Sequence, residues 1–436
     1  MPPEPAPGTA PDLAPEPADA PADAPAPTTR ADAPLRIVAA GLLALAVAMG
    51  IGRFAFTPLL PVMLGEGGVD LAAGTWLATA NYFGYLVGAI ACAAQPVVWA
   101  RRGWPPLDAA RNVRIGLVAT AVLTGGMALP LPALWPALRF AAGVASALVF
   151  VYTSGWCLGR LAALGRPRLA GAIYAGPGVG IFASGLLVGG ATAAGGSAAT
   201  GWALFAVLAG GRTLAVGSRV RGAPALAGAP AAVGGFTAEQ GVFAFAYGLS
   251  GFGYIITATF LPVIARELLP PSPWLAWFWP LLGAGVVVGA LLATRVSPRV
   301  DFRHALAGCY AMQAAGVVVG AWWPGVATFA LGSVLVGLPF TAISFFGMQE
   351  ARRLSPAAPA ALMGLSTAVY GLGQIAGPPA AAWLIAHAPN PATGFGWALD
   401  AAAATLVAGA AGLVLLVRAR PSRLSGSGSS PARTAR

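Results

Sequence analysis

The chain has 436 residues, of which 57% are hydrophobic and 9% are charged, and its net charge is +11. Soluble domains carry about 25% charged residues, so this composition excludes a soluble globular protein and indicates a chain that lies mostly in lipid. All 25 basic residues are arginines, and most of them lie in short loops between apolar runs or in the C-terminal tail. That placement argues against a nucleic-acid partner and leaves the lipid bilayer as the expected surroundings.

Residues 1–34 are rich in Pro, Ala and Asp and have almost no large apolar side chains. Such a segment buries too little apolar surface to fold, so we expect a disordered tail. Twelve apolar runs follow, and each has at least the roughly 18 residues that span a bilayer as a helix. We predict spans at residues 36–64, 73–98, 114–132, 135–160, 169–190, 199–219, 239–264, 274–294, 304–323, 326–350, 359–387 and 394–417.

The predicted spans form two sets of six. Residues 35–219 are expected to form an N-terminal bundle and residues 239–418 a C-terminal bundle, and the Ala-, Gly- and Pro-rich segment 220–238 is expected to link them. Residues 419–436 are predicted to form a second disordered tail.

Arginine alternates between loops in the way this count requires. The loop after the second span contains Arg101 and Arg102, and the loop after the tenth contains Arg352 and Arg353. The loops after spans one, three, five, nine and eleven contain no arginine, and the loop after span seven contains only Arg266. Since basic loops face the cytoplasm, we expect both termini, the linker and the tails to be cytoplasmic.

The first and seventh spans repeat each other. GIGRFAFTPLLPV begins at Gly50 and GFGYIITATFLPV begins at Gly251, an offset of 201 residues. The two copies are six helices apart, so both run in the same direction across the membrane. Parallel repeats related by an axis along the membrane normal are typical of the major facilitator fold.

Four segments carry a resemblance to a known family: GIGRFAFTPLLP, TWLATANYFGYLVGA, YAGPGVGIFASGLLVGG and YGLSGFGYIITATFLPVIAR. The chain resembles the YbfB/YjiJ-type branch of the major facilitator superfamily over nearly all of residues 36–417. The resemblance implies an all-α integral membrane protein with twelve transmembrane helices in two pseudo-symmetric six-helix bundles. It also implies alternating access by a monomeric secondary transporter in the inner membrane of a bacterium.

Arg53 is a charged residue in the middle of the first span, where a charge costs roughly 3 kcal/mol and is normally partnered and functional. Asn81 and Tyr85 are four apart on the second span and share a helix face toward it. Tyr254 is the repeat partner of Arg53, and Gln374 is a polar residue in the eleventh span. We predict that these five residues line a mid-membrane cavity for a small solute. An organic anion is the best candidate, because arginine binds carboxylate and phosphate bidentately.

A structural role for Arg53 is the open alternative. Its guanidinium could instead bond to Asn81, to Tyr85 or to backbone carbonyls freed near Pro58 and Pro61, and so fix the helix packing.

Four further residues are candidates for gating or hinge motion. Arg139 and Gly143 resemble a superfamily signature in span four, and Arg139 is expected near the outer surface. Gly176 and Pro177 resemble part of an antiporter signature, which favours export. Pro262 is expected to kink span seven.

Acidic candidates for proton coupling are few. Glu350 ends span ten, where an ion pair with Arg352 or Arg353 is the competing explanation, and Asp400 lies near the outer end of span twelve. We expect no metal site and no cofactor, since the cysteines lie apart in apolar runs and His387 is isolated.

Three function classes follow. The first is a secondary transporter of a small organic anion, with a proton-coupled exporter that is not selective for anions as its alternative. The second is a membrane solute sensor that does not transport. The third is a membrane enzyme acting on lipid, which is disfavoured because the acidic residues are scattered and the two histidines lie on opposite sides. We therefore expect no enzymatic activity.

Overall fold

The computed structural model describes residues 34–105, 107–217, 220, 235–297, 300–356 and 358–420. Within these ranges every regular element is a helix. Nearly all of the two predicted tails and most of the predicted linker lie outside the described residues.

Each predicted span corresponds to a helical segment. The N-terminal elements are α1 (Pro34–Leu45), η2 (Ala46–Phe54), α2 (Phe56–Gly65), α3 (Leu71–Arg101), α4 (Ala109–Gly126), η3 (Pro132–Leu134), α5 (Trp135–Ala163), η4 (Pro167–Ala175), α6 (Gly176–Ala193) and α7 (Ala198–Gly217). The C-terminal elements are α8 (Ala238–Leu268), η5 (Pro273–Trp277), α9 (Phe278–Ala293), α10 (Phe302–Trp322), α11 (Val326–Gly337), α12 (Phe340–Leu354), α13 (Pro359–Ala386) and α14 (Pro391–Ala419).

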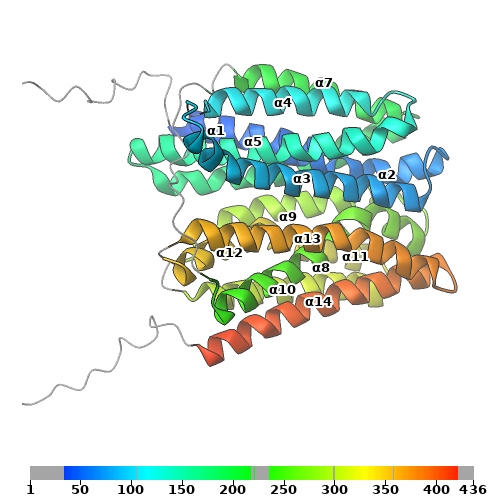
Figure 1. Cartoon of the computed structure of the whole chain (residues 1–436). Coiled ribbons are helices and arrows are strands. Elements are labelled where there is room, and N and C mark those ends of the chain that lie inside the picture. The colour runs from blue at the N-terminus through cyan, green and yellow to red at the C-terminus, as the bar shows by residue number, and fades with distance from the viewer. Residues whose placement is uncertain are drawn as a thin grey trace, which may run out of the picture. The chain divides into compact units, whose positions relative to one another are not determined.

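Ten helical segments within the described ranges are long and apolar enough to cross a membrane. The two predicted spans outside that set, α4 and α13, are helices of 18 and 28 residues. Both run alongside the ten spans (Figure 1). α4 is the less apolar because Arg111 and Arg114 lie in its first two turns. α1 begins and α14 ends at the same end of the helices, as an even number of spans requires (Figure 1).

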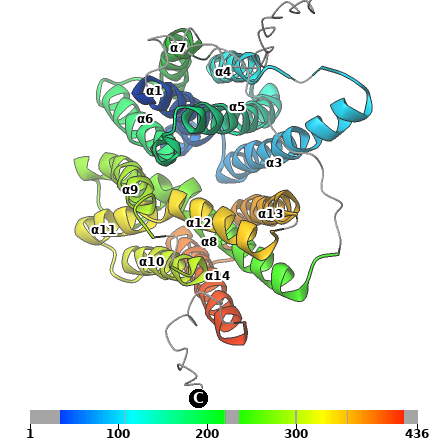
Figure 2. The same cartoon turned by 90° about the vertical axis from the view of Figure 1, so that its left-hand side faces the viewer.

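The helices divide into two groups, α1–α7 and α8–α14, as the view along them shows (Figure 2). The main contacts between the groups join three pairs of spans: α3 packs on α13, η4 and α6 pack on η5 and α9, and α2 packs on α8. This is the predicted arrangement of two six-helix bundles.

The repeated glycines make equivalent contacts in the two bundles. Gly50 in span one packs so closely on span five that a Cβ there would lie 2.3 Å from Cα of Gly180. Gly251 in span seven packs on span eleven, where a Cβ would lie 2.4 Å from the carbonyl oxygen of Tyr370. Spans five and eleven are themselves six helices apart, so the sequence repeat is also a repeat of packing. Small residues permit this close approach of helices in a membrane.

Several of the few acidic residues serve as helix caps. The side chains of Asp70, Asp108 and Asp301 accept hydrogen bonds from backbone N–H groups at the starts of α3, α4 and α10. Glu66 accepts a 2.8 Å bond from the backbone N–H of Ala198 at the start of α7. These four carboxylates lie at helix ends, away from the middle of the spans.

Candidate functional site

The site is built on an irregular turn of the first span. Residues Ala46–Phe54 form a π-helix between α1 and α2, and all nine residues are buried. π-helical turns are rare and often occur at functional sites. Pro58 follows one turn later and has no N–H to donate, so a carbonyl of the preceding turn needs another donor. Arg53 lies in this turn, near the middle of the span, and is 3% exposed.

Arg53 bonds across the two bundles. Its Nη2 donates to the side-chain carbonyl of Gln374 on α13. The amide nitrogen of Gln374 then donates to the hydroxyl of Tyr254 on α8. The structure therefore brings together Arg53, its repeat partner Tyr254, and Gln374, three residues singled out from the sequence.

Aromatic rings enclose the guanidinium. Its Cζ lies 4.2 Å from the ring centroid of Tyr85, 5.1 Å from that of Tyr82 and 5.3 Å from that of Phe54. A cation over an aromatic face is stabilised by roughly 0.5–2 kcal/mol, more when desolvated. Tyr85, also singled out from the sequence, thus contacts Arg53 through its ring.

The positive charge of Arg53 has no acidic partner among the described residues. The ion pairs found there join carboxylates to Arg303 and Arg353 instead. The Nε of Arg53 is buried and has no hydrogen-bond partner. Burying an unpaired charge is costly, so this guanidinium is a group to which an anion would bind favourably.

The expectation that Arg139 lies near the outer surface is wrong. Its side chain is 2% exposed and points into the bundle. Nη1 donates to the carbonyl of Gly52 at 3.2 Å and Nη2 donates to the carbonyl of Arg53 at 3.0 Å. Arg139 therefore satisfies carbonyls of the irregular turn before Pro58. Because the arginine side chain is long, its guanidinium lies deeper in the bundle than the position of its Cα indicates.

Asn81 supports the same turn and does not bond to the guanidinium of Arg53. Its Nδ2 donates to the carbonyl of Arg139 at 2.9 Å and to that of Gly52 at 3.4 Å. Its Oδ1 is buried without a partner. Asn81 thus joins spans one, two and four beside the site.

Two hydrogen bonds connect the bundles next to the site. The hydroxyl of Thr57 donates to the carbonyl of Ala258 at 2.8 Å. The hydroxyls of Tyr82 and Thr259 lie 2.8 Å apart. Thr57 lies one turn beyond Arg53 toward the end of the span opposite Pro34, so these bonds close that side of the site.

Glu350 belongs to a cluster of charged side chains at the ends of three helices. It is fully buried and pairs with Arg353 and, at 3.4 Å, with Arg303. Arg303 also pairs with Asp301 at 2.9 Å and with Glu239 at 3.3 Å. The cluster connects α8, α10 and α12, which all belong to the second bundle.

The remaining predicted residues lie away from Arg53. Asp400 is exposed and accepts a 2.9 Å hydrogen bond from the indole of Trp322. Gly176 and Pro177 form the junction at which η4 becomes α6, and a Cβ on Gly176 would lie 2.4 Å from the carbonyl oxygen of Leu42. Pro262 lies inside the continuous helix α8.

The family assignment rests on a direct comparison. A family model described as "uncharacterised MFS-type transporter YbfB" matches residues 45–415. The chain belongs to this family. It is therefore a multi-pass membrane protein of a transporter family, as the segments quoted above indicated. A comparison with curated proteins finds no match.

Solved structures show the fold of this YbfB-type protein. The crystal structure of the nucleoside transporter NupG is similar with a TM-score of 0.66 at 14% identity, covering 89% of this chain and 100% of that chain. The crystal structure of a point mutant of NupG gives the same TM-score at 15% identity, covering 88% and 99% of the two chains. At this identity the similarity establishes the major facilitator fold alone.

Several residues of the YbfB-type site were not found from the sequence. Tyr82 contacts Arg53 and Thr259, and Tyr370 stacks on Tyr254 with ring centroids 5.7 Å apart. Tyr82 is three residues before Tyr85, which places both on one helix face, so helical spacing could have revealed it. Phe340 packs edge-on against Tyr254 at 4.9 Å, a contact that nothing local in the sequence indicates.

Proposed function

We propose that this YbfB-type protein is a secondary transporter of a small organic anion and that Arg53 holds the anionic group of the substrate. The observation that carries this proposal is the buried guanidinium of Arg53, which has no carboxylate partner among the described residues. Such a charge costs several kcal/mol in the membrane interior unless it is paired. A bound carboxylate or phosphate would supply the missing charge.

The hydrogen-bonding groups around Arg53 suit such a ligand. One Nη of Arg53 is bonded only to the neutral Gln374, and Nε has no partner. An anion could therefore displace the amide and take two parallel bonds from the guanidinium. The freed Gln374 amide and the Tyr254 hydroxyl, now bonded to each other, would be available to other polar groups of the solute.

The aromatic residues indicate a further property of the solute. Tyr254 and Tyr370 stack with their ring planes 18° apart, and Tyr370 stacks on Tyr247 with centroids separated by 4.9 Å. Tyr85 and Tyr370 are only partly buried, whereas Tyr254 is buried. Rings of this kind favour a solute with an apolar or flat body attached to its anionic group.

We propose alternating access as the transport mechanism. The cross-bundle bonds from Thr57 to Ala258 and between Tyr82 and Thr259 close one side of the site. Opening that side requires both bonds to break while the bundles rock about the level of Arg53. The cluster around Arg303 lies within one bundle and could move with it as a unit.

We infer the membrane location and the oligomeric state from the arginine-rich loops and from the family resemblance. The arginine-rich loops favour a cytoplasmic location of both termini under the positive-inside rule. We infer a bacterial inner membrane and a monomer from the family resemblance.

An exporter of cationic compounds is the competing function. It would need a buried acid near the solute. Among the described residues Glu350 is the only fully buried carboxylate, and it is paired with arginines at the end of α12. This favours an anionic substrate.

Counterflow in proteoliposomes tests the proposed function. Liposomes containing purified protein are loaded with one unlabelled solute and given a trace of the same labelled solute outside. The panel contains mono- and dicarboxylates, aromatic carboxylates, sugar phosphates, nucleosides and organic cations. Nucleosides are included because NupG, whose fold is similar, is a nucleoside transporter. Uptake of an organic acid above protein-free liposomes supports the proposal, whereas uptake of cations alone contradicts it, and no flux with any solute that binds indicates a sensor.

A further inference from the structure

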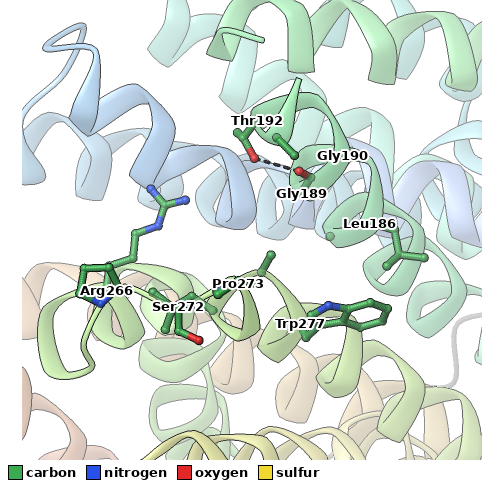
Figure 3. Close-up of a pocket in the computed structure, with 13 residues that line it drawn as sticks. Leu186, Gly189, Gly190, Thr192, Arg266, Ser272, Pro273 and Trp277 are labelled. Carbon is green, nitrogen blue, oxygen red and sulfur yellow. Dashed lines mark hydrogen bonds between the residues drawn. The ribbon is translucent and has the colours of Figure 1, made fainter. Parts of the chain in front are cut away.

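A pocket of about 750 Å³ lies between the end of α6 and the segment that joins α8 to α9. Leu186 and Gly190 line it from α6, and Arg266 and Trp277 line it from the other bundle (Figure 3). It lies at the end of the helices opposite Pro34. None of the residues around Arg53 line it, so it is a separate site.

Arg266 is the polar group that this pocket leaves available. It is exposed and forms no ion pair or hydrogen bond with any described residue, including its neighbour Glu267. The other polar side chains of the pocket are already engaged. The hydroxyl of Thr192 donates to the carbonyl of Val188 at 2.9 Å, and the hydroxyl of Ser272 accepts a bond from the backbone N–H of Trp274 at 3.3 Å.

The rest of the pocket wall is apolar. Leu186 is 40% exposed and Trp277 is 45% exposed, so both present apolar surface at the junction of the bundles. Gly190 adds no side chain, and a Cβ built there meets nothing within 4 Å. Trp274, next to the pocket, is 60% exposed. Exposed tryptophans at the end of a span mark the level of the lipid headgroups.

We propose that this pocket binds an anionic phospholipid, with the headgroup phosphate on Arg266 and an acyl chain along Leu186 and Trp277. A single unpaired cation at the headgroup level beside an apolar wall matches a ligand with one charged end and one hydrocarbon end. A soluble anion would use the cation but would leave the apolar wall exposed. The site does not depend on what the protein transports.

Two variants test this site, one at its cation and one at its apolar wall. Arg266→Gln removes the cation, and Gly190→Leu fills the pocket from a position where the new side chain meets open space. Two variants on α7 are matched controls. Arg212→Gln removes another exposed arginine, and Gly211→Leu adds a side chain at another exposed glycine with nothing within 4 Å.

Native mass spectrometry of the full-length protein in detergent gives the apparent dissociation constant of each lipid. The probes are dioleoyl phosphatidylglycerol, dioleoyl phosphatidylcholine, inorganic phosphate and glycerol 1-phosphate. We expect the wild type to bind phosphatidylglycerol more tightly than phosphatidylcholine. Arg266→Gln should weaken phosphatidylglycerol binding about fivefold, as expected for one basic group near an anionic lipid. Gly190→Leu should remove the tightest-bound molecule, and both α7 variants should bind like the wild type.

Two results would overturn the proposal. One is binding of phosphatidylglycerol that is the same in all five proteins. The other is Arg266-dependent binding of inorganic phosphate or glycerol 1-phosphate that is as tight as binding of the lipid, since the apolar wall would then contribute nothing. Neither result bears on the transport of organic anions through the site at Arg53.

Discussion

The hydroxyl of Thr57 donates a 2.8 Å hydrogen bond to the carbonyl of Ala258, the residue one repeat length of 201 positions away. Residues that meet their own repeat partners lie at the axis relating the two halves. Arg53 and Tyr254 form a second such pair one turn away, joined through the side chain of Gln374. The candidate site therefore lies on the axis that relates the two bundles, at the level about which they are proposed to rock.

Cross-linking at this axis should stop transport. In a background with Cys92, Cys157 and Cys309 replaced by serine, Thr57→Cys and Ala258→Cys are introduced together and oxidised. A disulfide would hold closed the side of the site that Thr57 closes, so we expect counterflow to fall to the level of protein-free liposomes and to return on reduction. Each single cysteine variant serves as a control and should be insensitive to oxidant. Full transport by the cross-linked protein would show that this contact does not open.

The close packing of spans one and five should not tolerate a methyl group. A Cβ on Gly180 would lie 2.4 Å from the carbonyl oxygen of Ala46 and 2.6 Å from Cα of Gly50. Gly180→Ala should therefore push the helices apart and cost about 1–3 kcal/mol, measured as a lower unfolding midpoint in detergent. Gly190→Ala, on the same helix with nothing within 4 Å of its Cβ, is the control and should be neutral or slightly stabilising. Equal midpoints for the two variants would refute the packing argument.

Glu350 should contribute to stability rather than carry protons. Glu350→Gln removes the carboxylate that Arg303 and Arg353 share, and breaking a buried pair costs about 3 kcal/mol or more. We expect the Glu350→Gln variant to have a clearly lower unfolding midpoint in detergent than the wild type. Asp400→Asn, at an exposed position, should change stability by less than about 0.5 kcal/mol. If Glu350→Gln instead keeps the wild-type unfolding midpoint and its transport no longer depends on a pH gradient, that result supports proton coupling through Glu350.

The elements that the sequence predicts correctly depend on local patterns. Runs of apolar residues locate the helices because each span must be long and apolar enough to cross the bilayer by itself. Arginine-rich loops mark the ends of the spans because basic loops face the cytoplasm. The repeat relates Arg53 to Tyr254 because both copies preserve the same glycines. Gln374 could be selected because a polar side chain in an apolar run needs a partner.

The features that the sequence did not reveal depend on neighbours distant in the chain. The π-helix over Ala46–Phe54 is completed by Arg139, whose guanidinium crosses from span four to the carbonyls of Gly52 and Arg53. The position of Arg139 in its own span predicts an outer location, and only the packing of the spans shows where its side chain ends. The cluster around Arg303 likewise unites three helices that are far apart in the sequence.

The role of Arg53 is the central claim, and ligand-induced thermal stabilisation tests it most directly. Detergent-purified wild type, Arg53→Ala and Arg53→Lys are heated with organic acids, nucleosides and organic cations, and circular dichroism at low temperature checks that each variant folds. We expect organic acids to stabilise the wild type, Arg53→Lys to respond weakly because lysine lacks the bidentate fork, and Arg53→Ala not to respond. If a folded Arg53→Ala protein is stabilised by anions as strongly as the wild type, Arg53 is a packing residue and the assignment of an anionic substrate is wrong.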